Sequence, residues 1–60
     1  FIAINKKYIL YNIGRDIYFG KTNSKVMSKY TAAMDIKNLI IVSDTTFVVI
    51  YSNSLEVVTV

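Results

Sequence analysis

The sequence contains no cysteine, histidine, proline or tryptophan, and only two glycines in 60 residues. Without cysteine no disulfide can form, and without cysteine and histidine the usual ligands of a structural zinc ion are missing. The same two absences remove the commonest general base and the thiol nucleophile. We therefore expect no catalytic residue, no metal site and no cofactor, and interpret the chain as non-enzymatic.

The glycines and acidic residues do not fit a known site pattern either. Gly14 and Gly20 have neither P-loop nor dinucleotide-binding spacing. A permissive backbone at a hairpin tip explains Gly14, and a strand bend or bulge explains Gly20. The four acidic residues lie at or near predicted turns, so we expect solvated carboxylates rather than catalytic pairs: Asp16, Asp35, Asp44 and Glu56.

No apolar run is long enough to predict a membrane span. The longest apolar region, residues 39–51, is interrupted by polar residues 43–46, whereas a span needs about 20 mostly apolar residues. The sequence also starts without the basic leader and apolar run of a signal peptide. Together with the lack of cysteine, this favours an intracellular location over a secreted one.

The chain is rich in apolar residues for its size. Hydrophobic residues make up 53% of it, whereas a domain of about 60 residues buries only about 60% of its unfolded surface. A single core this small supplies roughly 3–5 kcal/mol. We therefore expect a partner to cover part of the apolar surface. The start at Phe1 rather than at Met also suggests a piece of a longer polypeptide.

Strand-forming residues dominate the chain, with Ile, Val, Tyr, Phe and Thr separated by short polar turns. An irregular helix over residues 24–34 is an alternative for that segment. The pattern predicts eight strands over residues 2–5, 8–12, 17–21, 25–29, 31–35, 39–43, 46–52 and 55–60.

A shift of 30 residues aligns the chain with itself. Apolar runs and turns stay in phase without a gap, which predicts a single module, 1–60, built from two repeats, 1–30 and 31–60. The aligned segments include Ala3 with Ala33, Lys7 with Lys37, 9–11 with 39–41, and 22–24 with 52–54.

The repeat unit resembles the blades of β-propellers of the YVTN and quinoprotein-like kinds. The resemblance lies mainly in residues 35–42 (DIKNLIIV), 46–51 (TFVVIY) and 53–58 (NSLEVV), and it is looser in residues 1–30. It implies an all-β fold of two four-stranded antiparallel sheets, a partial propeller. Because a ring needs about four to eight blades, it also implies that the chain is part of a larger propeller or that copies assemble into one. The sequence has no Trp-Asp or Gly-His pair, and WD40 repeats are longer.

The alternative fold is one small barrel of five or six strands, of the SH3-like or Sm-like kind. In the two-blade interpretation, one set of apolar residues packs blade on blade, while the outer surfaces meet another polypeptide or further copies of the chain. The residues assigned to the packed faces are Ile9, Tyr11, Leu39, Ile41, Phe47 and Val49.

Charge is unequally divided between the two halves. Residues 1–30 carry six basic side chains and one acidic side chain, whereas residues 31–60 carry one basic and three acidic ones. A small basic β module could bind RNA or DNA phosphates while bases stack on aromatic rings. The candidate contacts are Lys6, Lys7, Arg15 and Lys21, with Tyr11 or Tyr18 stacking. Two other interpretations remain open: lysines that only protect sheet edges, and a viral or phage particle component.

Overall fold

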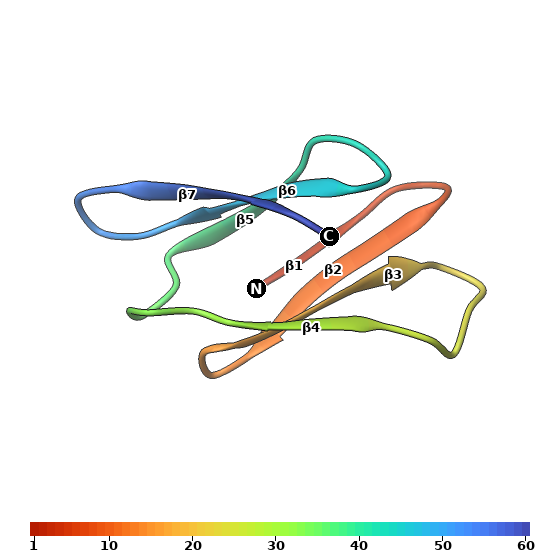
Figure 1. Cartoon of the computed structure of the whole chain (residues 1–60), viewed down its shortest axis with the longest axis horizontal. Helices are drawn as coiled ribbons and strands as arrows, with labels where there is room; N and C mark the ends of the chain where they lie inside the picture. Colours follow the sequence, from red (N-terminus) through yellow and green to blue (C-terminus); the bar gives the residue numbers. More distant parts are fainter.

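The chain folds into seven short β-strands without any helix (Figure 1). The computed structural model describes all 60 residues, and no helix in it could cross a membrane. The strands are β1 (Ile2–Ile4), β2 (Tyr8–Ile13), β3 (Asp16–Lys21), β4 (Ser28–Thr31), β5 (Asn38–Ile41), β6 (Thr46–Ile50) and β7 (Leu55–Thr59).

These strands form two antiparallel sheets. The N-terminal sheet has the order β1-β2-β3-β4, and the C-terminal sheet has the order β5-β6-β7. In each sheet every strand pairs with the next one along the chain, so both sheets are simple meanders (Figure 1). The prediction of an all-β fold with two antiparallel sheets is confirmed, although the C-terminal sheet has three strands instead of four.

The missing strand is the one predicted over residues 31–35. The N-terminal sheet ends at Thr31, and the following residues cross from one sheet to the other without strand pairing. Ala32 and Ile36 in this connection are buried in the core, so their small and branched side chains fill the space where the chain passes between the sheets. The helix considered over residues 24–34 is also wrong, because part of that segment forms β4.

The tight turns follow from individual polar residues and glycines. Between β1 and β2, the Asn5 Oδ1 atom accepts hydrogen bonds from the backbone N–H groups of Lys7, at 2.8 Å, and Tyr8, at 2.7 Å. Between β2 and β3, Ile13 pairs with Asp16 across a two-residue turn in which Gly14 has a φ of +62°. Only glycine adopts such a φ without steric cost, which agrees with the hairpin-tip interpretation.

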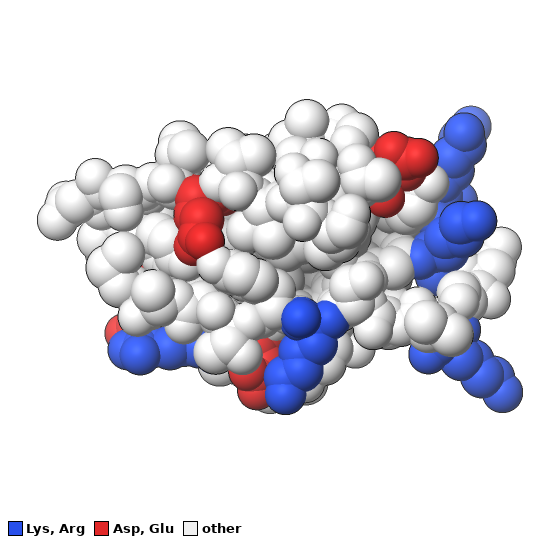
Figure 2. Space-filling view, viewed as in Figure 1, with Lys and Arg blue, Asp and Glu red and all other residues white.

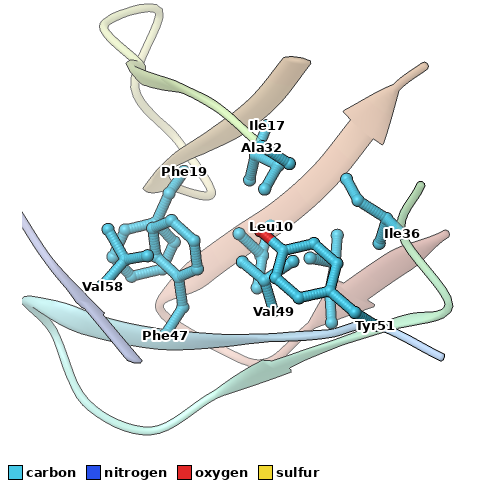
Figure 3. Packing of buried hydrophobic residues seen from close by; sticks show 10 residues of the cluster. Leu10, Ile17, Phe19, Ala32, Ile36, Phe47, Val49, Tyr51 and Val58 are labelled. Atoms are coloured by element: carbon cyan, nitrogen blue, oxygen red, sulfur yellow. The ribbon is translucent and has the colours of Figure 1, made fainter. Parts of the chain in front are cut away.

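The core lies between the two sheets (Figure 3). Phe19 of β3 contacts Phe47 of β6, with ring centroids 5.4 Å apart and planes inclined by 54°. Tilted contacts of this kind are favoured by the charge distribution of aromatic rings. The ten buried residues are Leu10, Ile17, Phe19, Ala32, Ile36, Leu39, Phe47, Val49, Tyr51 and Val58.

The prediction of the packed faces is right for the C-terminal sheet and wrong for two residues of the N-terminal sheet. Leu39, Phe47 and Val49 are buried, and Ile41 packs against the core. Ile9 and Tyr11, in contrast, lie on the outer face, because Leu10 between them is fully buried opposite Phe19. Since side chains alternate along a strand, a shift of one residue exchanges the two faces.

The shift arises from the ungapped 30-residue alignment, which matches Ile9 with Leu39. In the structure the inward-facing residue that corresponds to Leu39 is Leu10, so the true spacing at this strand is one residue shorter than the 30 residues of the alignment. The barrel alternative is wrong as well. The strands are divided between two separate sheets, and no backbone hydrogen bond connects one sheet to the other.

Candidate functional site

The three lysines predicted to contact nucleic acid lie at one end of the N-terminal sheet. Lys6 and Lys7 occupy the β1–β2 turn, and Lys21 ends β3 opposite Tyr8. With Asn23 they line a shallow hollow. Figure 2 shows basic side chains gathered at the end of the molecule where the β1–β2 turn and the β3–β4 loop lie. We call Lys6, Lys7 and Lys21 the lysine cluster.

Arg15 is at the opposite end of the same sheet. It lies in the β2–β3 turn, and β2 separates this turn from that of Lys6 and Lys7. A strand of six residues spans about 20 Å. The Arg15 Nε atom is 3.2 Å from Asp35 Oδ1, in a solvent-exposed ion pair. Arg15 and the lysine cluster therefore do not form one continuous basic surface.

The two candidate stacking residues, Tyr11 and Tyr18, face each other on the outer side of the N-terminal sheet. They are cross-strand partners in β2 and β3, with ring centroids 5.2 Å apart and planes inclined by 24°. Each tyrosine is half-buried. Because each ring stacks on the other, their mutual contact already covers part of the aromatic surface that a base would use.

Aliphatic side chains flank this tyrosine pair on the side of β1 and β2, whereas Lys29 of β4 lies opposite Tyr18 on the other side. Ile2 and Ile4 of β1 pair with Tyr11 and Ile9, and Ile13 ends β2, so all of them are on the outer side of the sheet. Ile2, Ile4 and Ile13 are 61–68% exposed. We define the outer N-terminal face as Ile2, Ile4, Ile9, Tyr11, Ile13 and Tyr18.

The C-terminal sheet has a similar outer surface. The cross-strand row Ile40–Val48–Val57 runs over all three strands on the side away from the core. Ile40, Val57 and Leu55 are 46–62% exposed. We define the outer C-terminal face as Ile40, Val48, Ile50, Leu55 and Val57. No charged residue of β5, β6 or β7 lies on this side, because the only one, Glu56, points inward.

Glu56 is the polar group that the sequence interpretation placed wrongly. It was expected to be a solvated turn residue, but it is half-buried on β7 and links the two sheets. The Tyr30 hydroxyl of β4 donates a hydrogen bond to Glu56 Oε2, and the Tyr51 hydroxyl donates to Oε1 at 2.7 Å. We call these three residues the inter-sheet clasp. The alternation of Glu56 with buried Val58 along the predicted strand was the signal that could have located it.

The clasp shifts the pKa of each of its members. Hydrogen bonds from Tyr30 and then Tyr51 stabilise the carboxylate and lower the pKa of Glu56 below its ordinary value of 4.5. The hydrogen bond to Glu56, followed by burial, raises the pKa of Tyr30 above 10.0. Burial, followed by the hydrogen bond to Glu56, raises the pKa of Tyr51 above 10.0. The ionised carboxylate and the two neutral phenols therefore stabilise one another.

The remaining acidic residues are dispersed. Asp16 lies 3.8 Å from Lys29 Nζ and accepts a hydrogen bond from Thr31 Oγ1 at 3.1 Å. Asp35 pairs with Arg15, and Asp44 lies in the β5–β6 turn. No three acidic residues come together in a group that could hold a metal ion.

Comparison with known proteins adds no relative: no family model matches the chain, and no curated protein or solved structure is significantly similar to it.

Proposed function

We propose that this chain is a non-enzymatic assembly module whose two outer sheet faces are covered by polypeptide, as part of a larger propeller or complex. The observation that carries the proposal is the exposure of aliphatic side chains on both outer faces at once. Six of them are 46–68% exposed: Ile2, Ile4, Ile13, Ile40, Leu55 and Val57. Contiguous apolar patches of this kind typically mark interaction surfaces.

The sequence of the central strand of the C-terminal sheet supports the proposal. In β6, Phe47 and Val49 point into the core, while Val48 and Ile50 point outward. A sheet with one wet face normally alternates apolar with polar residues, whereas continuous apolar runs are typical of strands buried on both sides. The composition of β6 is therefore that of a strand that is covered on both sides.

The energetics point the same way. Burying an aliphatic side chain fully contributes about 1.5–3 kcal/mol, so covering one that is about half exposed contributes roughly 1 kcal/mol. For six such side chains the sum is roughly 6 kcal/mol, similar to or larger than the stability that a core of this size supplies alone. Coverage of the outer faces is thus a large contribution to the free energy of folding.

The propeller interpretation is supported by the arrangement of the sheets rather than by any detected relative. Two antiparallel meanders stack face to face around one core (Figures 1 and 3), and each keeps an apolar outer face. In a closed ring of blades each sheet has a neighbour on both sides, so sheets with apolar residues on both faces fit this arrangement. The chain would then contribute two successive blades.

Light scattering over a concentration series tests this function. We expect the native chain to associate with increasing concentration, and the double variant Ile13→Lys/Val57→Lys to remain a monomer of 6.8 kDa. Val26→Lys is the matched control, because Val26 is 80% exposed but lies in the β3–β4 loop, outside the strands that form the two faces. A native chain that stays monomeric at millimolar concentration would exclude the assembly function.

The lysine cluster supports a second candidate function, binding of single-stranded RNA or DNA. Its three ammonium groups and Tyr8 surround one hollow, where they could contact phosphates of a strand. With about three phosphate contacts, log Kobs should fall with log salt with a slope of about −2. We expect the variant in which all three lysines become Gln to lose this binding, and Arg15→Gln at the far end to retain it. Equal loss in both variants would exclude the lysine cluster as the site.

A further inference from the structure

We propose that the outer N-terminal face of one copy binds the outer C-terminal face of a second copy, so that copies associate head to tail. This inference depends on the proposed assembly function and specifies its partner. The observations that support it are the packing between the two sheets within the chain, the relief of the two outer faces, their charges, and their areas.

The chain already packs one of its sheets on the other. Within the chain, the N-terminal sheet packs on the C-terminal sheet, with Leu10 and Phe19 on one side of the core and Leu39 and Phe47 on the other. A head-to-tail contact would again place an N-terminal sheet on a C-terminal sheet, this time through the outer faces. N-terminal and C-terminal sheets would then alternate through successive copies.

The two outer faces have complementary shapes. The stacked rings of Tyr11 and Tyr18 form a bulky ridge in the middle of the outer N-terminal face. The corresponding row of the outer C-terminal face, Ile40–Val48–Val57, contains only short aliphatic side chains. Bulky residues pack well against smaller ones in protein cores. Two N-terminal faces would instead oppose one tyrosine ridge to another.

The charges of the two outer faces are compatible. The outer C-terminal face has no charged side chain. On the outer side of the N-terminal sheet, Asp16 lies opposite Ile13 and Lys29 lies opposite Tyr18, and these two charged residues form an ion pair with each other. A head-to-tail contact would therefore bury no unpaired charge, which would be costly.

The area of a single outer face is small for a stable interface. Four strands about 4.8 Å apart and about 17 Å long cover roughly 300 Å², well below the ~800 Å² that each partner buries in a stable interface. A symmetric dimer through one face would bury only this small area and leave the other face in water. Head-to-tail association uses both faces of every copy, and it ends in a closed ring or an open filament.

Two single variants separate the arrangements. Ile13→Lys blocks the outer N-terminal face, and Val57→Lys blocks the outer C-terminal face. If copies associate head to tail, every contact needs one intact face of each kind. A solution of either variant alone contains only one kind of intact face, so each variant alone should be monomeric. An equimolar mixture still contains one intact face of each kind and should form a 1:1 complex of about twice 6.8 kDa.

The other outcomes overturn the inference in distinguishable ways. A dimer of Val57→Lys alone would show that N-terminal faces bind each other, and a dimer of Ile13→Lys alone would show the same for C-terminal faces. A monomeric mixture under conditions where the native chain assembles would indicate a different occupant and leave the assembly function standing. A monomeric native chain would exclude both. Circular dichroism verifies folding, and Ile2→Lys with Leu55→Lys repeats the test at neighbouring positions.

Discussion

The two sheets of this chain have similar inner faces and different surroundings. Inside, Leu10 and Leu39 occupy equivalent positions, as do Ile17 and Phe47. Outside, the N-terminal sheet combines isoleucines with a tyrosine pair and has lysines at its turns, whereas the C-terminal sheet presents an uncharged aliphatic face. Packing fixes the inner pattern of both sheets, whereas their outer faces differ from each other and, as we propose, are complementary.

The largest loss of stability is expected from a substitution in the core between the two sheets. Phe47 is 1% exposed and contacts both Phe19 and Tyr30. Phe47→Ala removes a large buried ring and should cost about 3–5 kcal/mol, enough to unfold a domain of this size. Its neighbour Val48, on the outer face, is the matched control. Thermal unfolding followed by circular dichroism should show no cooperative transition for Phe47→Ala and a nearly unchanged one for Val48→Ala in the monomer.

A smaller effect is expected at Gly20, where the β3–β4 loop folds back on the N-terminal sheet. A Cβ atom there would lie 2.7 Å from Met27 Sδ and 2.8 Å from the carbonyl oxygen of Val26. Because the backbone oxygen cannot move without displacing the loop, Gly20→Ala should destabilise the fold by about 1–3 kcal/mol.

Gly14→Ala separates this crowding from backbone strain. Nothing lies within 4 Å of a Cβ at Gly14, but its φ of +62° is unfavourable for alanine, with a cost of about 1–2 kcal/mol. Urea denaturation measures both variants. If Gly20→Ala is as stable as the native chain, the loop does not pack on β3 as described.

The smallest expected effect is the pH dependence that the inter-sheet clasp confers. Because the folded pKa of Glu56 is lowered, its stabilising contribution is complete above the ordinary value of 4.5 and is lost as the pH falls through the folded pKa. Because the pKa values of Tyr30 and Tyr51 are raised, their contribution is complete below 10.0 and is lost at higher pH.

Glu56→Gln isolates the acid side of this dependence. Between pH 7 and about pH 3 the melting temperature of the native chain should fall more than that of the variant, since only the native chain loses an ionised clasp. Asp44→Asn, in the β5–β6 turn, is the control and should follow the native chain. Parallel melting curves for all three proteins would contradict the assigned role of Glu56.

The sequence predicted the class of fold and most strand positions because strand-forming residues alternate with turn residues throughout. It predicted the inner face of the C-terminal sheet correctly, since Leu39, Phe47 and Val49 are all buried. It misplaced Ile9 and Tyr11 because every residue of 8–11 is apolar or aromatic. Such a run does not show which side of the strand faces the core, and the register is decided by pairing with β3.

The candidate site was less predictable for a related reason. The sequence grouped Arg15 with the lysines because they share a half of the chain, but a hairpin places its turn and its open end far apart. Contacts between the sheets, such as Tyr30 with Glu56, join residues 26 apart in the chain. Such contacts depend on how the sheets stack, which no local pattern encodes.

The central claim is that both outer faces are covered in the assembled protein, and hydroxyl-radical footprinting at low and high protein concentration tests it most directly. Ile13 and Val57 report on the two faces, and Val26 in the exposed loop is the internal control. We predict that oxidation of Ile13 and Val57 falls together as the concentration rises, while that of Val26 stays constant. Unchanged oxidation of Ile13 and Val57 at every concentration would contradict the claim.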